Sequence, residues 1–341
     1  MNHRSGGPRS FNTIKRSHRE ERSKRRLLCA KTLAAATIVF FLLALTFFIL
    51  LACNLAVEIH DRRAGKNDTP AIPELTYVPI TTPTSAYREG DTVVVNGGYA
   101  YAFPQKDAEQ LVSLLDYRKL VGGKYPYEIK TDKTQQLQRS AAESLDALLT
   151  AYYNRTGVVV KVYDTYRTPD EQTRIGQNSG VPAGYSEHHT GLVVWLSDQR
   201  SAGSLNMSEH AELLEMCHQY GFIQRYPEGK SAITGVTNYG ECLRYVGVAH
   251  ATYMVQNGLC LEEYVQLLRK NHISLNGSDG KHLGVDVNGD KTADYAVYYV
   301  PKSDSADLTT VYVPSGMNYS VSGDNMGGFI VTVTLSPKQN S

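Results

Sequence analysis

An uncharged apolar run near the N-terminus constrains this chain more than any other feature. Residues 32–54 contain no charged side chain, and most of them are Leu, Ala, Phe, Ile or Val. About twenty such residues suffice to cross a bilayer as a helix whose backbone groups all bond internally. Residues 1–31 hold ten Lys or Arg against two Glu, and such a basic flank stays in the cytoplasm. The sequence therefore predicts a cytoplasmic tail over 1–31, an uncleaved transmembrane signal anchor over 32–54 and an extracytoplasmic remainder.

A lipid anchor is the alternative for the same region. Residues 50–53 (LLAC) resemble a lipoprotein-processing box, and lipidation of Cys53 would hold the protein at the same outer face of the membrane. The long basic segment over 1–31 and the residue Leu51 fit a lipoprotein signal poorly, which favours the transmembrane helix over 32–54. In both cases the expected location is the cell membrane.

Net charge and cysteine content exclude several classes of protein. The net charge is +1, so no overall field attracts nucleic acid and no nucleic-acid partner is expected. Only three of the five cysteines follow the apolar run, and no C-x-x-C pair occurs. This set predicts neither a disulfide framework nor a cysteine-rich zinc site.

Composition divides the rest of the chain into three parts. Residues 55–90 are rich in Thr and Pro and lack helical periodicity, which predicts a semi-extended stalk. Residues 91–275 combine helical and strand patterns, which favours an α+β domain with a central, largely antiparallel sheet and flanking helices. Residues 280–341 carry short alternating β runs separated by Gly, Asn, Asp and Ser, which predicts a small β appendage.

Apolar spacing identifies individual elements of the α+β part. Apolar residues recur every three or four positions over 137–152, so an amphipathic helix is expected there, ended by Gly157. Ser208 is the expected N-cap of a second helix that stops at Gly221. The other expected elements are a helix over 262–270 and strands over 158–163, 192–196 and 242–245.

Three segments carry the polar chemistry. They are 164–172 (DTYRTPDEQ), 185–195 (YSEHHTGLVVW) and 239–247 (YGECLRYVG). In this order they resemble the S-G-Y-R-S-x-x-x-Q, S-x-H-x-x-G-x-A-x-D and E-P-W-H-F-R-Y-V-G motifs of zinc D-alanyl-D-alanine carboxypeptidases of the VanY type. The resemblance runs roughly from Val93 to Leu268. It implies that family's fold, a role in peptidoglycan metabolism and a stem peptide as partner.

The resemblance also implies a zinc site that has lost most of its ligands. His188 matches the family's first ligand, but Trp195 stands where the family has an Asp ligand, and an indole has no lone pair for a metal. Cys242 replaces the third ligand, a His, and Tyr239 replaces the Glu that serves as general base. Because a phenol titrates at about pH 10, Tyr239 is not a base near neutrality. No catalytic residue is therefore assigned, and no cofactor is expected unless a zinc site has been rebuilt.

Four residues are candidates for substrate binding: Arg167, Gln172, Ser186 and Tyr239. Arg167 and Gln172 are in register with the family's Arg and Gln, and the resemblance implies that this Arg contacts the peptide at the reacting centre. A guanidinium can hold a carboxylate through two hydrogen bonds without any metal. A structural ion pair is the equal alternative for Arg167.

These substitutions predict a membrane-anchored pseudopeptidase that binds stem peptides. The alternative is an active carboxypeptidase with a rebuilt zinc site, in which His188 and Cys242 are ligands. Glu241 or His250 would then supply a third ligand. A further possibility is a structural surface protein whose groove is closed by Trp195. Metal binding separates the first two hypotheses.

Residues 286–294 (DVNGDKTAD) resemble a calcium loop, because oxygen ligands stand at alternate positions. The candidate ligands are Asp286, Asn288, Asp290 and Asp294. The Gly expected at the sixth position is Lys291, and no Glu follows at the twelfth. A hairpin turn at 288–289 is therefore favoured over a calcium site.

Overall fold

The computed structural model describes residues 70–198, 205–237, 239–270 and 282–335. The predicted cytoplasmic tail, the predicted anchor over 32–54 and Cys53 lie outside these residues. Within them, every helix is too short or too polar to cross a membrane.

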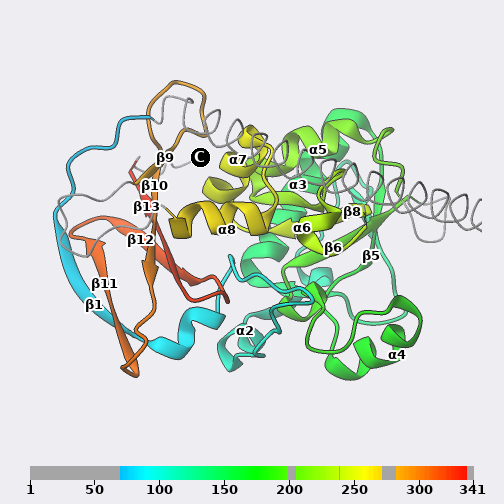
Figure 1. The fold of residues 1–341 in the computed structure, drawn as a ribbon. Coiled ribbons are helices and arrows are strands. Elements are labelled where there is room, and N and C mark those ends of the chain that lie inside the picture. The colour runs from blue at the N-terminus through cyan, green and yellow to red at the C-terminus, as the bar shows by residue number, and fades with distance from the viewer. Residues whose placement is uncertain (1–69, 199–204, 238, 271–281, 336–341) are drawn as a thin grey trace, which may run out of the picture. The chain divides into compact units, whose positions relative to one another are not determined.

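A five-stranded sheet lies at the centre of the part of the fold that carries the three motifs (Figure 1). In spatial order its strands are β3 (Tyr127–Ile129), β5 (Val160–Asp164), β6 (Val193–Ser197), β8 (Tyr239–Tyr245) and β7 (Phe222–Tyr226). The β3–β5 pair is parallel and the other three pairs are antiparallel. The predicted α+β architecture with a largely antiparallel sheet is confirmed.

Helix α3 (Arg139–Thr156) packs on this sheet because its apolar residues share one side. Leu145 and Leu148 are fully buried and belong to the same hydrophobic cluster as Val162 of β5. The helix ends at Gly157, whose φ of 71° is a left-handed conformation that glycine adopts without a steric penalty. The predicted helix and its predicted stop are both confirmed.

The helix predicted to start at Ser208 starts later. Helix α5 (Ala211–Cys217) continues as the 3-10 helix η4 (His218–Tyr220) and ends at Gly221, as predicted. The N–H of Ser208 instead donates to the side-chain oxygen of Asn206 at 3.2 Å. The predicted N-cap is wrong because Asn206 draws Ser208 into a turn that precedes the helix.

Shorter elements surround the first sheet. They are η1 (Thr84–Arg88), α2 (Gln105–Glu109), β2 (Leu111–Ser113), η2 (Leu114–Asp116), β4 (Gln136–Gln138), α4 (Pro169–Ser179), η3 (Glu187–Thr190), α6 (Ser231–Thr234), α7 (Val248–Asn257) and α8 (Leu261–Lys270). Strands β2 and β4 pair with each other. Helix α4 begins with a capping box between Thr168 and Glu171. Helix α8 matches the helix predicted over 262–270, whereas α4 and α7 were not expected from the sequence.

The C-terminal residues form a second, antiparallel sheet. In spatial order its strands are β12 (Asn318–Gly323), β13 (Gly328–Thr334), β10 (Tyr295–Pro301) and β9 (Leu283–Val285). Strand β11 (Leu308–Pro314) pairs elsewhere, with β1 (Tyr77–Pro83). The β runs predicted over 280–341 are confirmed, and β12 is an additional strand.

The second sheet is integral to the domain and is not the separate appendage that the sequence predicted. Its residues Val297 and Ile330 belong to the same hydrophobic cluster as Val265 of α8. Figure 1 shows α8 between the two sheets. Because the helix and the sheet bury each other's apolar faces, the C-terminal strands complete a core that begins in the first part of the fold.

Part of the predicted stalk is also a strand of the domain. Strand β1 lies within the range 55–90 and pairs antiparallel with β11 along its whole length, from Tyr77 opposite Pro314 to Pro83 opposite Leu308. It has a single partner strand, and an edge position tolerates prolines such as Pro79. From Tyr77 onward, the Thr- and Pro-rich composition therefore belongs to an edge strand and not to a linker.

Candidate functional site

Strand β6 brings the altered motif residues together. In its antiparallel register, Trp195 lies opposite Asp164 of β5 and opposite Cys242 of β8. Directly paired residues project from the same face of a sheet, so these three side chains are neighbours. The His188 ring, from η3, stacks on the Trp195 ring with 6.5 Å between centroids and an interplanar angle of 17°. Four residues from four elements therefore form one site.

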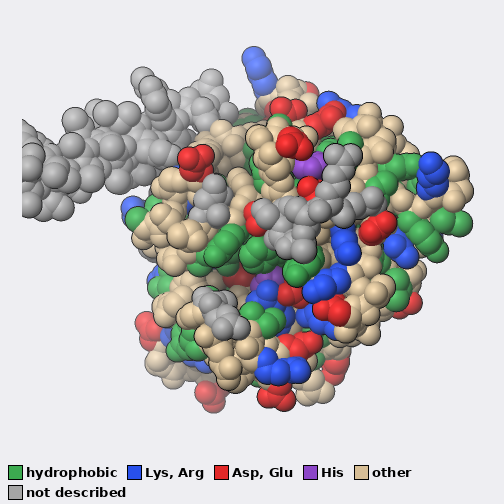
Figure 2. All heavy atoms as spheres, turned by 90° about the vertical axis from the view of Figure 1, so that its right-hand side faces the viewer, with side chains coloured by type: hydrophobic (Ala, Val, Ile, Leu, Met, Phe, Trp, Pro, Cys, Tyr) green, Lys and Arg blue, Asp and Glu red, His purple; other side chains and the backbone are tan. Residues whose placement is uncertain are grey.

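Figure 2 shows the face of the domain where α4 and β5 lie. It is hollowed near its middle, where His, basic and acidic side chains lie together, and hydrophobic side chains border the hollow. Such a face offers partners to both the anionic and the apolar groups of a ligand.

His188 is held as a neutral imidazole. Its Nδ1 lies 2.5 Å from the Thr165 carbonyl oxygen. A carbonyl only accepts hydrogen bonds, so Nδ1 carries the proton and Nε2 keeps a lone pair. Burial, assisted by the nearby Arg167, lowers the pKa of His188 to about 3. At neutral pH this residue therefore offers one hydrogen-bond acceptor and no charge.

Aromatic rings occupy the two positions where the family resemblance implies a zinc ligand and a general base. The Trp195 ring centroid lies 5.2 Å from that of Tyr239, which in turn lies 6.4 Å from that of Tyr226. Tyr239 is 38% exposed, so the cluster reaches the surface. The indole Nε1 is buried and has no hydrogen-bond partner among the residues that the structure describes, and an unsatisfied donor costs about 1–3 kcal/mol. The site therefore contains a donor that the protein itself does not use.

The donor atoms at this site do not fit a zinc ion. Burial raises the pKa of Cys242 to about 12 in the metal-free protein, and with His188 it would supply only two of the four ligands of a structural zinc site. Trp195 supplies no lone pair. His250 is engaged elsewhere, with Tyr264 at 2.7 Å and Thr332 at 3.0 Å. Across the described ranges, no three His, Cys, Asp or Glu side chains group in a way that could hold a metal ion.

Arg167 forms an ion pair and still has donors for a ligand. Its Nε and Nη2 both lie 2.7 Å from Asp164 Oδ2, and its Nη1 donates to Gln172 at 3.0 Å. These contacts use three of the five N–H groups of a guanidinium. Lys133 lies 2.9 Å from the other Asp164 oxygen. Burial alone would raise the pKa of Asp164, but Arg167 and Lys133 help to hold it below its usual value.

Gln172 positions Arg167 and does not face a ligand. Its Oε1 accepts from Arg167, its Nε2 donates to the Val181 carbonyl at 2.8 Å, and the residue is buried. Ser186 is also buried, immediately before η3. Among the four predicted binding residues, Arg167 and Tyr239 are therefore the ones with groups open to a ligand.

A buried ion network fixes the segment that carries His188. Arg225 donates to Glu187 at 2.9 Å and to the two oxygens of Glu262 at 2.9 and 2.6 Å. Arg244 donates to the other oxygen of Glu187. Two cations and two anions thus balance inside the domain. Because Glu187 adjoins His188, the network ties η3 to β7, β8 and α8.

Several of these residues were not identified from the sequence. The signal for Asp164 was a departure from the family motif, which has Ser at that position. No motif marks Lys133, because only the fold brings it to Asp164. Glu187 is flanked by Ser186 and His188, and Arg225 follows Gln224, so no apolar context in the sequence marks either charge as buried.

The candidate calcium loop joins β9 to β10 and is built as a hairpin loop. The Asp286 carboxylate accepts backbone N–H groups from Asn288, Gly289 and Lys291. Asp294 accepts from the Asn288 side chain at 2.7 Å, and Asp290 accepts from the Thr292 N–H at 2.8 Å. These oxygens stabilise the loop over 286–294, and the choice between a turn and a calcium site stays a prediction.

Known proteins resemble this chain along most of its length. The sequence profile of the VanY family, described as D-alanyl-D-alanine carboxypeptidase, matches residues 134–248. A D-alanyl-D-alanine carboxypeptidase of Enterococcus faecium is 28% identical over 316 residues, which cover 86% of this chain and 95% of that relative. The bifunctional D-Ala-D-Ala dipeptidase and D-Ala-D-Ala carboxypeptidase VanXYC of Enterococcus gallinarum is 30% identical over 156 residues, which cover 39% of this chain and 80% of that relative.

A solved structure agrees with the fold. The vancomycin resistance D,D-dipeptidase VanXYg superposes with a TM-score of 0.61 at 24% identity, covering 76% of this chain and 99% of that chain. The family match contains all three polar segments, 164–172, 185–195 and 239–247. With 30% identity across four fifths of VanXYC, the relationship extends beyond the motifs. The chain belongs to the VanY family of D-alanyl-D-alanine carboxypeptidases.

Proposed function

We propose that this protein is a membrane-anchored, extracytoplasmic pseudopeptidase that binds peptidoglycan stem peptides without hydrolysing them. The observation that carries the proposal is the ring cluster of Trp195 and Tyr239, at the positions where the family has a zinc ligand and a general base. Zinc in such enzymes activates the water that attacks the scissile carbonyl. An indole and a phenol supply neither a metal ligand nor a base near neutral pH.

The groups left at the site suit the carboxyl end of a peptide. Arg167 retains two N–H donors beyond its contacts with Asp164 and Gln172. Neutral His188 supplies an acceptor for a peptide N–H, and the ring of Tyr239 offers an apolar surface to a methyl group. Hydrogen bonds to charged groups contribute about 1.5–3 kcal/mol, so Arg167 is expected to dominate affinity. The activity named for the relatives supports a ligand that ends in D-Ala-D-Ala.

Anchoring at the outer face of the membrane is part of the proposal. Its support is the uncharged run over 32–54 behind a strongly basic segment over 1–31. Peptidoglycan lies on that side of the membrane, so the predicted orientation places the Arg167 site beside its ligand.

Intrinsic fluorescence measures binding at this site directly, because Trp195 is the only Trp of the chain. Titration of the full-length protein with a stem pentapeptide ending in D-Ala-D-Ala should change the emission saturably, and no free D-alanine should accumulate. Arg167→Ala should weaken binding at least about tenfold, because a charge-assisted hydrogen bond is lost. Arg174→Ala is the matched control, since Arg174 is an exposed arginine of α4, and it should leave affinity unchanged.

Zinc analysis separates this proposal from a rebuilt zinc site. Full-length protein purified without chelators and given excess zinc should hold no stoichiometric metal. Stoichiometric zinc that disappears in Cys242→Ser, together with release of D-alanine, would contradict the pseudopeptidase and support the active enzyme. Absence of any response to the peptide, in fluorescence and in calorimetry, would contradict the binding role.

A further inference from the structure

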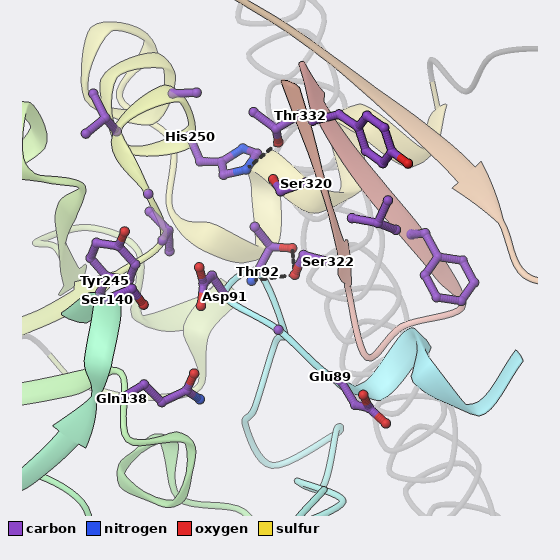
Figure 3. A pocket seen from close by; sticks show the side chains of 18 of the residues that line it. Glu89, Asp91, Thr92, Gln138, Ser140, Tyr245, His250, Ser320, Ser322 and Thr332 are labelled. Carbon is purple, nitrogen blue, oxygen red and sulfur yellow. Dashed lines mark hydrogen bonds between the residues drawn. The ribbon is translucent and has the colours of Figure 1, made fainter. Parts of the chain in front are cut away.

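A cavity lies between the two sheets of the domain (Figure 3). Its volume is about 880 Å³, within the size range of small-molecule pockets. One wall is formed by Gln138, Ser140 and Tyr245. Neither Trp195 nor Arg167 lines it, so the two sites are distinct.

The opposite wall and the floor of this cavity are rich in hydroxyl groups. Ser320 and Ser322 of β12 and Thr332 of β13 form that wall, and Asp91 and Thr92 lie between the two walls (Figure 3). Thr92 and Ser322 bond to each other at 2.8 Å, which holds the floor against β12. Because a hydroxyl group both donates and accepts, the lining suits a ligand that carries hydroxyl groups itself.

Acidic groups outnumber basic groups around the cavity. Glu89, Asp91 and Asp107 line it together with one cation, Lys106. In the described part of the chain, none of the four takes part in an ion pair. Burial raises the pKa of Asp107, and repulsion from Glu89 and Asp91 raises it further. A positively charged ligand would relieve this repulsion.

Asp91 is the carboxylate with the greatest need of a partner. Its side chain projects between the two walls (Figure 3). Burial raises the pKa of Asp91, and the charges of Arg244 and Lys106 offset only part of this rise. The nearest buried cation, Arg244, donates to the Asp91 backbone oxygen at 2.8 Å. The charge of Arg244 is matched by its ion pair with Glu187. The Asp91 carboxylate is therefore left to interact with whatever occupies the cavity.

We propose that this cavity binds an organic ammonium compound that carries hydroxyl groups, with Asp91 accepting from the ammonium and Ser140 and Ser320 contacting the hydroxyl groups. An ammonium group beside a half-buried carboxylate forms charge-assisted hydrogen bonds. The described residues offer no group of three side chains able to hold a metal ion, which favours an organic cation over a metal. The assignment does not rest on peptide binding, because the two sites share no lining residue.

Calorimetric titration of the full-length protein with glucosamine tests the proposal, with N-acetylglucosamine as the matched probe. The two sugars share a hydroxyl-bearing ring, but the ammonium group is absent from the acetylated one. Glucosamine is expected to bind saturably at neutral pH, and N-acetylglucosamine at least about tenfold more weakly. Asp91→Asn should weaken glucosamine binding by a similar factor. Asp304→Asn, at a carboxylate that is 94% exposed, is the control and should have no effect.

Two results would overturn the assignment: equal affinity for the two sugars, or unchanged glucosamine affinity in Asp91→Asn. Absence of saturable glucosamine binding would overturn it as well. If Asp91→Asn does not fold, Ser320→Ala provides the second test, because Ser320 lies on the exposed strand β12. Weaker glucosamine binding is expected there, and unchanged binding counts against the assignment. Arg167→Ala should leave glucosamine binding intact, which separates this site from the peptide site.

Discussion

At the scale of single residues, burial determines which titratable groups are charged. The thiol of Cys242 has its pKa raised to about 12, whereas the pKa of His188 is lowered to about 3 and that of His250 to about 4. All three side chains are therefore neutral near pH 7. An unperturbed cysteine is already mostly a thiol at pH 7 and an unperturbed histidine is mostly neutral, and burial extends these neutral states over a wider range of pH.

Burial of His250 should make stability depend on pH. Its pKa is about 4 in the folded protein against an ordinary 6.5, so the unfolded chain binds more protons between these values. Stability therefore rises with pH across this window and is lost as pH falls from 6.5 toward 4, by about 1.4 kcal/mol per pH unit from this group. The measurement is the free energy of unfolding in urea at several pH values. In His250→Gln, the slope of this free energy against pH should be smaller by about that amount.

The control for the dependence on pH is Leu268→Ala, a truncation in the hydrophobic cluster that contains Tyr264, the hydrogen-bond partner of His250, and it removes no titratable group. It should lower the free energy of unfolding by about 2–5 kcal/mol at every pH and leave the slope unchanged. A His250→Gln protein with the slope of the parent chain would refute the assignment of this proton to His250.

At the scale of elements, the ion network connects pieces of chain that share little else. Glu187 of η3, Arg225 of β7 and Arg244 of β8 have side chains that are no more than 2% exposed, and Glu262 of α8 is 5% exposed. Removing charges from water is costly, and each charge here is offset only by its partners. The network therefore fixes the orientation of η3 more than it adds net stability.

Breaking this ion network should strongly lower the free energy of unfolding. Arg225→Met leaves Glu187 and Glu262 without their shared cation, so the free energy of unfolding should fall by about 3–5 kcal/mol. Adding Glu262→Gln should cost less than the sum of the two single changes, because one of the uncompensated charges is removed. Urea unfolding with an unchanged denaturant slope is the measurement.

An exposed ion pair serves as the control for that experiment. Lys302 pairs with Asp304, which is 94% exposed. Lys302→Met should therefore change stability by no more than about 0.5 kcal/mol. If Arg225→Met changes the free energy of unfolding as little as Lys302→Met does, the buried network does not fix the orientation of η3.

At the scale of the whole molecule, the two sheets share a core through α7 and α8. Val265 of α8 packs in one cluster with Val285 and Val297 of the second sheet and with Ile223 of the first. The face of α8 that the second sheet covers would be exposed if that sheet were absent. The described residues should therefore unfold as one cooperative unit.

Removing the second sheet should abolish that cooperativity. A chain that ends at Lys270 loses the strands that cover Val265, so its calorimetric transition should be broad or absent, whereas the full-length protein should show a single sharp transition for this domain. Two separate transitions in the full-length protein, with the earlier part still folded after truncation, would show that the C-terminal strands are an independent appendage after all.

Elements with local signals were predictable, and elements with distant partners were not. Helix α3 and its stop at Gly157 followed from spacing and from a C-cap glycine, which are properties of neighbouring residues. The cap at Ser208 was predicted wrongly because the Ser208 N–H and hydroxyl both donate to the Asn206 side chain, in a turn that precedes the helix. Strand β1 was not recognised because Tyr77 pairs with Pro314, far along the chain.

By itself, the sequence determined the family and the order of most elements, and it placed Trp195 where the resemblance implies a zinc ligand, because these follow from residue identity and local spacing. Only the tertiary structure decided that Trp195 stacks on His188, that Asp164 holds Arg167, and that Asp91 projects into the cavity between the two sheets. Those outcomes depend on contacts between distant segments. They also depend on burial, which controls the charge of each side chain and is set only when the sheets and helices pack together.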